Sequence, residues 1–196
     1  MSQSTPNRGR RPSSATRNAI LSACFEILGE VGYSGMSIEG VASRAGAGKT
    51  TIYRWWNGKA QLAVDAFFHA TLAELAFPDT GSAESDFRAQ IIELAAFLRG
   101  PRGAVLAAML NGARNDPELA NALQTRWLEP RRRWGVERMS RAMNVGECRE
   151  GIDMVAALAV LYSPLYTPLL FGQDVPSRME VEAYLAIACQ GIFLQR

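Results

Sequence analysis

The sequence predicts an all-α fold of about nine helices, and two features of its patterning carry that prediction. From Ser14 onward, apolar residues recur every three or four positions, which is the spacing of one buried helix face. No stretch keeps the alternation of apolar and polar residues that is typical of a half-buried strand. A chain of 196 residues with 48% hydrophobic and 20% charged side chains is long and apolar enough to bury a sizeable core.

The first four predicted helices follow one another closely. A helix over 14–32 is predicted to end at Gly32, and Ser37 is the candidate N-cap of a short second helix. Glycines at 46 and 48 separate it from a third helix over 49–56, and a fourth covers 59–76. The residues predicted to face inward are Ile20, Cys24, Ile27, Leu28, Val31, Ile38, Val41, Ala42, Ala45, Ile52, Trp56, Leu62, Ala66 and Phe67.

Five more helices are predicted in the remainder of the chain. Apolar stripes indicate helices over 87–98 and 104–113. A long helix over 116–143 contains Pro130, which removes a backbone hydrogen bond and is predicted to kink it. Ser177 and Glu180 form the capping-box pattern S-x-x-E at the start of a last helix that ends near Phe193.

The remaining predicted helix, over 155–171, lies just before the last one. It raises the question of a membrane span because it has no charged residue. A span needs about 20 apolar residues. This stretch is shorter and contains Pro164 and Pro168. We therefore expect a helix buried in a core or an oligomer interface, and no membrane contact.

Composition removes most enzyme classes. The three cysteines (Cys24, Cys148 and Cys189) are far apart, which predicts neither a disulfide framework nor a cysteine metal site. One histidine, His69, cannot supply a site that needs two imidazoles. We expect no cofactor, no metal and, without a secretion signal, a cytoplasmic protein. The acidic residues Glu147, Glu150 and Asp153 are expected to be solvated helix caps.

Charge is distributed unevenly along the chain. Residues 1–60 hold eight Lys or Arg and three acidic residues, whereas residues 61–196 hold thirteen and sixteen. A basic end joined to an acidic body favours a polyanion-binding module on a separate scaffold. We predict a flexible basic arm over 1–13, a DNA-binding domain over 14–60 and a helical domain over 61–196. The run 131–133 of three arginines is expected to be a solvated helix face with ion pairs.

The stretch 37–59 has the spacing of a helix-turn-helix. Two short helices that cross at a steep angle need a small residue at the contact, a permissive residue in the turn, and an apolar residue beyond it. Ala42, Gly46 and Ile52 meet these needs at separations of four and six. Gly46 can adopt the positive φ that such a turn requires.

This segment resembles the DNA-binding module of the TetR (tetracycline-repressor-like) family. The matching residues are Ser37, Val41, Ala42, Ala45, Gly46, Ala47, Gly48, Ile52, Tyr53, Trp56 and Lys59. The resemblance covers about the first sixty-five residues in order and spacing. It implies that the other helices form a domain that binds a small molecule and pairs two copies of the chain.

The second helix of such a motif meets base edges in the major groove with its N-terminal half. Lys49, Thr50 and Thr51 occupy that half, and Arg54 lies one turn further on. Ser37, at a helix N-terminus, can bind a phosphate. The resemblance implies backbone contacts for Tyr53, Trp55 and Lys59. The partner is then double-stranded DNA with a pseudo-palindromic operator, bound by a homodimer.

The family resemblance also implies a ligand pocket among the C-terminal helices. Candidate pocket residues are flexible or aromatic: Phe97, Met109, Trp127, Trp134, Met139, Tyr162 and Tyr166. Candidate dimer residues are Leu158, Leu161, Tyr162, Tyr184 and Ile187. The sequence thus predicts a transcriptional regulator, a repressor that a small and mostly apolar effector releases.

Two other classes compete with this interpretation. A small helical ligand-binding or scaffold protein would make the basic N-terminus incidental. A nucleotide-dependent enzyme is suggested by Gly48-Lys49-Thr50, but a P-loop needs glycine five positions before Gly48, where this chain has Ser43. It also needs a preceding strand, whereas the spacing over 38–45 is helical.

Overall fold

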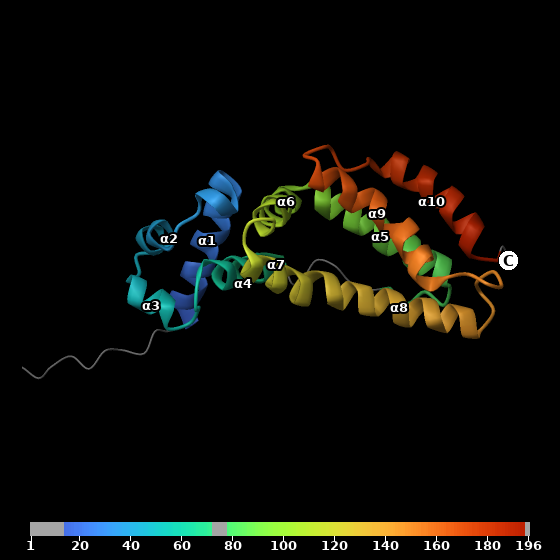
Figure 1. The fold of residues 1–196 in the computed structure, drawn as a ribbon, viewed down its shortest axis with the longest axis horizontal. Helices are drawn as coiled ribbons and strands as arrows, with labels where there is room; N and C mark the ends of the chain where they lie inside the picture. Colours follow the sequence, from blue (N-terminus) through green and yellow to red (C-terminus); the bar gives the residue numbers. More distant parts are fainter. Residues whose placement is uncertain (1–13, 72–77, 195–196) are drawn as a thin grey trace, which may run out of the picture. The chain divides into compact units, whose positions relative to one another are not determined.

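The computed structural model describes residues 14–71 and 78–194, which are helical almost throughout (Figure 1). Ten α-helices and one π-helical segment, η1, occur in these ranges. Because α7, η1 and α8 follow one another without a break, they make nine separate helices, as predicted. The described residues contain no β-strand, only an isolated antiparallel bridge between Cys148 and Phe193. None of their helices is both long and apolar enough to span a membrane.

The chain divides into two compact units, Met1–Ala70 and Thr71–Arg196. The predicted basic arm and the predicted end of the fourth helix at Ala76 lie outside the described residues. The division of roles at residue 60 stays a prediction. The helices that begin in the first unit are α1 (Ser14–Gly35), α2 (Ile38–Arg44), α3 (Lys49–Tyr53) and α4 (Lys59–Thr71).

Helix α1 departs from the prediction at its C-terminal end. Gly32 has a φ of 68° and a non-helical conformation, so the predicted stop occurs as a kink, after which the chain turns helical again to Gly35. Val31, predicted to be buried, is 54% exposed. It directly precedes the kink, and the next buried residue of α1 is Tyr33, on the other side of it.

The core of the first unit is centred on Ile52 and Trp56, both buried as predicted. The indole Nε1 of Trp56 donates to the Asp65 carboxylate at 2.8 Å. Arg17 donates to the same oxygen at 3.2 Å, and its guanidinium lies 5.4 Å from the centre of a Trp56 ring. These contacts join α1, the segment after α3, and α4, so α3 lies on a fixed support.

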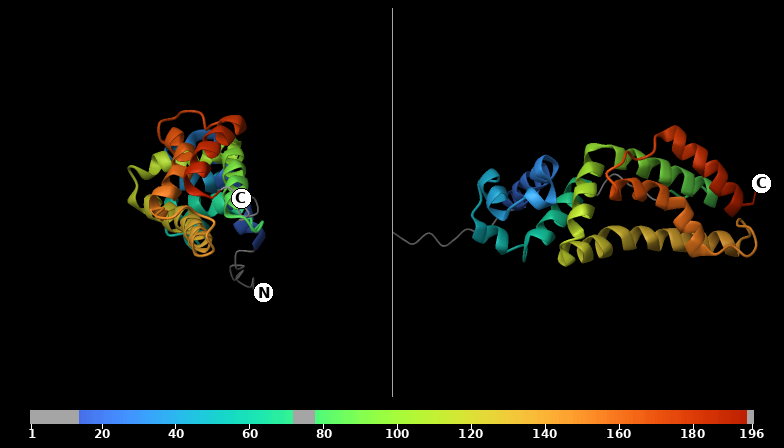
Figure 2. Two further views of the ribbon diagram at one scale, coloured as in Figure 1. Left: turned by 90° about the vertical axis from the view of Figure 1, so that its right-hand side faces the viewer. Right: turned by 45° about the horizontal axis from the view of Figure 1, so that its top comes forward.

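The second unit is organised around one central helix, α5, which contacts α6, α8, α9 and α10. Figure 2 shows α5, α9 and α10 lying alongside one another. The buried stripe predicted on α5, from Phe87 to Leu98, is confirmed. The elements are α5 (Ala83–Arg99), α6 (Pro101–Ala113), α7 (Pro117–Leu123), η1 (Gln124–Leu128), α8 (Glu129–Asn144), α9 (Met154–Leu170) and α10 (Arg178–Ile192).

Local signals in the sequence place the ends of these helices. Asp153 caps α9 through Ala156 N–H at 2.7 Å, and Ser177 and Glu180 form the predicted capping box. The long helix predicted over 116–143 is irregular just before Pro130, not at Pro130 itself. Segment η1 is a π-helical turn, so Glu129 N–H bonds five residues back to the Gln124 carbonyl, and Pro130 lies in the first turn of α8.

A buried cluster of charges joins α5 to α8. Arg138 donates from Nε to Asp86 at 2.6 Å and from both terminal nitrogens to Glu147 at 3.3 and 3.4 Å. The other oxygen of Asp86 accepts from the backbone and hydroxyl of Thr80. The prediction that Glu147 is a solvated cap is therefore wrong, because its carboxylate supplies the second counter-charge of buried Arg138.

Candidate nucleic-acid interface and ligand cavity

The turn between α2 and α3 has the geometry of a helix-turn-helix. Ala42 and Ile52 are buried, Gly46 has a φ of 61°, and Ala47 N–H donates to the Ala42 carbonyl at 2.9 Å. Ser37 caps α2, accepting from Gly40 N–H at 3.1 Å. The small contact residue, the positive φ and the apolar anchor predicted from spacing are all confirmed.

Gly46 offers a test of this turn. An added Cβ would meet nothing within 4 Å, so the cost of Gly46→Ala comes from the positive φ alone. We expect the free energy of unfolding to fall by about 1–2 kcal/mol. Chemical denaturation of the two proteins measures this.

Gly48→Ala is the matched control, because Gly48 has a φ of −76° and room for a Cβ. Its effect should be the smaller of the two. Equal losses at both positions would show that the positive φ does not limit the turn.

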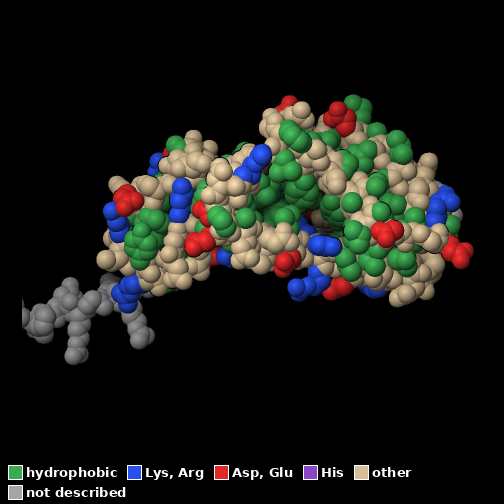
Figure 3. Space-filling view, in the orientation of Figure 1, with side chains coloured by type: hydrophobic (Ala, Val, Ile, Leu, Met, Phe, Trp, Pro, Cys, Tyr) green, Lys and Arg blue, Asp and Glu red, His purple; other side chains and the backbone are tan. Residues whose placement is uncertain are grey.

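The outer side of α3 is open to solvent. Lys49, Thr50, Tyr53 and Arg54 are exposed, whereas Ile52 is turned into the core. Thr51 and Trp55, in the same segment, are partly exposed. On the visible face of the first unit, at the left of Figure 3, Lys and Arg side chains lie among hydrophobic and acidic ones. The exposed side chains of α3 and of the two residues after it can thus offer cationic, hydroxyl and aromatic groups to a nucleic acid.

Lys49 has an intramolecular partner that the sequence analysis missed. Its ammonium donates to Glu39 of α2 at 2.5 Å, and both side chains are more than half exposed. The hydrogen bond from Lys49 lowers the pKa of Glu39. Exposed ion pairs are weak and are screened by salt, so Lys49 can exchange this carboxylate for a phosphate or base.

Three further predicted contact residues flank α3. The Ser37 oxygen accepts a capping bond, which leaves its O–H able to donate to a phosphate. Lys59 is partly buried and donates to the Ser34 carbonyl at 3.3 Å, with its ammonium 4.4 Å from the centre of the Tyr33 ring. Trp55 meets Trp56 edge to face at 5.5 Å between ring centres.

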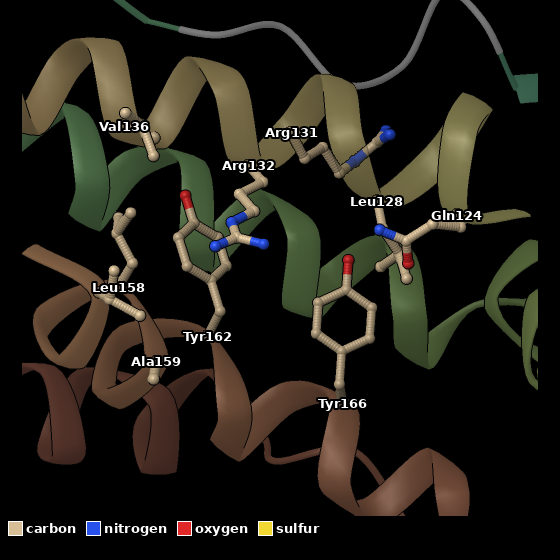
Figure 4. A pocket seen from close by; sticks show the side chains of 11 residues that line it. Gln124, Leu128, Arg131, Arg132, Val136, Leu158, Ala159, Tyr162 and Tyr166 are labelled. Carbon is tan, nitrogen blue, oxygen red and sulfur yellow. The ribbon is translucent and has the colours of Figure 1, made fainter.

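The second unit contains a cavity of about 440 Å³ between the η1–α8 run and α9 (Figure 4). A volume of this size suits a small organic ligand. Its lining is formed by Gln124, Leu128, Arg131, Arg132, Gly135, Val136, Val155, Leu158, Ala159, Tyr162 and Tyr166. Tyr162 and Tyr166 belong to the predicted pocket set.

The other predicted pocket residues do not line this cavity. Met109 and Met139 are fully buried in the core. Phe97 stacks on Trp127 at 5.6 Å between ring centres, and Trp134 packs on Phe87 at 5.2 Å. The size and flexibility of these side chains could not predict which of them border an open space.

The tyrosines of the cavity are held in place by hydrogen bonds. Tyr162 donates to Gln90 at 2.8 Å, and the Tyr166 oxygen accepts from Trp127 Nε1 at 3.3 Å. Burial raises the pKa of both phenols, so they stay neutral at ordinary pH. Figure 4 shows Arg132 extending from α8 toward these two rings.

The prediction that the arginines at 131–133 form a solvated face with ion pairs is only partly right, because Arg132 and Arg133 are exposed but Arg131 is partly buried. Among the described residues, none of the three forms an ion pair, and two line the cavity. A signal for this was present in the sequence. Arg131 follows Trp127 by four residues and Leu128 by three, which places it on an apolar helix face.

The predicted dimer residues separate into two groups. Leu161 is fully buried within the second unit, so its assignment to an interface is wrong. Leu158 and Tyr162 line the cavity instead, and Tyr184 donates to the Leu161 carbonyl at 3.3 Å. Ile187 is 76% exposed on α10 and is available to a partner.

Comparisons with known proteins agree with this division. Residues 20–66 match the model of bacterial regulatory proteins of the tetR family, and residues 77–188 match the tetracyclin repressor-like C-terminal domain. The uncharacterized HTH-type transcriptional regulator YdeS of Bacillus subtilis is 32% identical over 94% of this chain and 93% of its own length. The DNA-binding transcriptional repressor TetR of Mycobacteroides abscessus is 30% identical over 69% of this chain and 72% of its own.

Among solved structures, the TetR family transcription regulator SCO0332 superposes with a TM-score of 0.71. It is 31% identical and covers 92% of this chain and 100% of its own. The fold and the exposed α3 thus define a helix-turn-helix transcriptional regulator with a separate helical domain. The chain belongs to the TetR family.

Proposed function

We propose that this protein is a cytoplasmic, homodimeric repressor that binds a pseudo-palindromic operator and leaves it when a small molecule occupies the cavity of the second unit. The observation that carries the proposal is the exposure of Lys49, Thr50, Tyr53 and Arg54 on one helix whose Ile52 is fully buried. Such a helix can enter the major groove without unfolding its own support.

Each side chain has a chemical role in this proposal. Lys49 and Arg54 donate to guanine or phosphate, and Thr50 and Thr51 bond a base edge or touch a thymine methyl. Ser37, Tyr53, Trp55 and Lys59 bind the DNA backbone and fix the register of the helix. The Mycobacteroides abscessus relative is named a repressor, which favours repression over activation.

Release requires a ligand that binds one conformation better than the other. The cavity lies beside η1, and π-helical turns often mark functional positions in helices. A gel shift with the DNA that flanks the protein's own coding region tests operator binding. A discrete shifted band that survives excess non-specific DNA is expected; equal competition by any DNA would contradict sequence-specific regulation.

The proposed homodimer gives a prediction at Ile187. Val160 on α9 and Met179 and Ile187 on α10 are large apolar side chains more than half exposed. Two-fold pairing would cover them, since an isologous interface uses the same patch twice. Ile187→Glu is expected to give monomers in light-scattering chromatography and to weaken operator binding by about 100-fold, since one recognition helix then binds alone.

Val145→Glu is the matched control. Val145 is 67% exposed but lies in the connection after α8, not on α9 or α10. It should leave both the mass and the operator affinity unchanged. A dimeric Ile187→Glu protein would place the interface elsewhere.

A further inference from the structure

The cavity contains a cation without a counter-charge, Arg131. Its guanidinium lies 3.4 Å from the centre of the Trp127 ring, and its Nη1 donates to the Trp127 carbonyl at 3.2 Å. Its Nε is buried and has no hydrogen-bond partner among the described residues. Burial lowers the pKa of this arginine, yet the group stays charged at ordinary pH. A partly buried charge and an unpaired N–H are both unfavourable.

The N–H groups of Arg131 that lack a hydrogen-bond partner indicate which chemical group a ligand would need in order to bind them. Stacking on Trp127 and the bond to its carbonyl fix the guanidinium plane and use Nη1. The Nε and Nη2 groups share one edge of that plane, and no described residue bonds either of them. Two parallel N–H donors on one edge match the two oxygens of a carboxylate.

The rest of the cavity agrees with an acid on an apolar body. None of the lining residues is acidic, and Arg132 adds a second positive charge. The Tyr166 oxygen already accepts from Trp127, and its own proton has no acceptor among the described residues, so it can donate. The lining also contains the apolar side chains of Leu128, Val136, Val155, Leu158 and Ala159.

We propose that the cavity binds a small organic monocarboxylate, with the carboxylate held on the Nε–Nη2 edge of Arg131 and the apolar body against Leu128, Val136 and Leu158. This inference names the effector class for the proposed function. It rests on that function for its regulatory meaning, but not for binding itself.

Titration calorimetry on the full-length protein tests the proposal with matched pairs of probes. Naphthalene-2-carboxylate is compared with its carboxamide, and decanoate with decanamide, so that each pair differs only at the acid group. We expect at least one carboxylate to bind about ten-fold or more tightly than its amide, since a bidentate charged pair is lost with the amide. The two bodies distinguish a planar aromatic ligand from an extended chain.

Arg131→Gln should remove this preference, bringing the carboxylate to the affinity of its amide, and Arg131→Lys should recover only part of it because lysine lacks the fork. Arg133→Gln is the matched control, because Arg133 is an exposed neighbour that does not line the cavity. Circular dichroism checks that the variants are folded.

The outcomes separate this inference from the proposed function. Equal binding of acid and amide by the native chain, no carboxylate binding at all, or an unchanged preference in Arg131→Gln would each overturn the inference. An Arg131-dependent preference without any change in operator binding would support the inference and contradict ligand-controlled release. Operator binding by Arg131→Gln should equal that of the native protein.

Discussion

Replacing Lys49 and Arg54 together with alanine is expected to lower operator affinity by about 100-fold or more while the protein stays folded. Both side chains are exposed on α3, whereas the anchor of that helix, Ile52, is untouched. The loss should be largest for the operator and smaller for unrelated DNA, because base contacts contribute only to the specific complex. Fluorescence anisotropy with both DNAs measures the two affinities.

A matched exposed arginine controls for the loss of charge. Arg178 lies at the start of α10, where it pairs with Glu182, and its side chain is 76% exposed. Arg178→Ala should leave operator affinity within about two-fold, since Arg178 belongs to the second unit and not to the unit that carries α3. If the Lys49 and Arg54 variant bound the operator as tightly as the native protein, α3 would not be the recognition helix.

Removing one member of the buried charge cluster is expected to cause the largest loss of stability. Asp86→Asn leaves Arg138 buried with only Glu147, and breaking a buried pair in this way costs about 3–5 kcal/mol. Guanidinium unfolding at neutral pH measures the change. The double variant Asp86→Asn with Arg138→Met should lose less than the sum of the two single changes, because it leaves no uncompensated cation.

The same cluster predicts how stability depends on pH. Burial alone would raise the pKa of Asp86, but the hydrogen bonds from Arg138 and Thr80 outweigh it and lower that pKa below its ordinary value. The unfolded chain therefore takes up the proton first as the pH falls, so stability is present above about pH 4 and is lost in acid. Asp86→Asn should flatten this acid loss. If the stability losses of the two single variants simply added up, and if Asp86→Asn lost stability in acid as the native protein does, the cluster would not act as a unit.

The first unit could be predicted in detail from the sequence because its signals are local. The Ser37 cap, the Gly46 turn and the buried Ile52 lie within a few residues of one another, so spacing alone constrains them. The exceptions are Val31, which directly precedes the kink at Gly32 and is exposed, and Ala45, which is only partly buried.

The cavity and the charge cluster could not be predicted in the same way. Both depend on which faces α5, α8 and α9 present to one another, and that is a matter of packing between distant segments. Asp86 and Arg138 are 52 residues apart, and Arg131 reaches the cavity only because α9 lies across from α8. A solvated position was therefore expected for Glu147 and Arg131, whereas the structure places Glu147 in the buried charge cluster and Arg131 in the lining of the cavity.

The most direct test of DNA recognition by α3 is the salt dependence of operator binding. A cation held in the groove displaces counterions from the nearby phosphates even when it bonds a base. Lys49, Arg54 and Lys59 of both subunits should therefore make log affinity fall linearly with log salt concentration, with a slope of about −5. Removing Lys49 and Arg54 should bring the slope toward about −2, since only the contacts of Lys59 remain. A flat line for the native protein, or an equal slope for both proteins, would contradict the central claim.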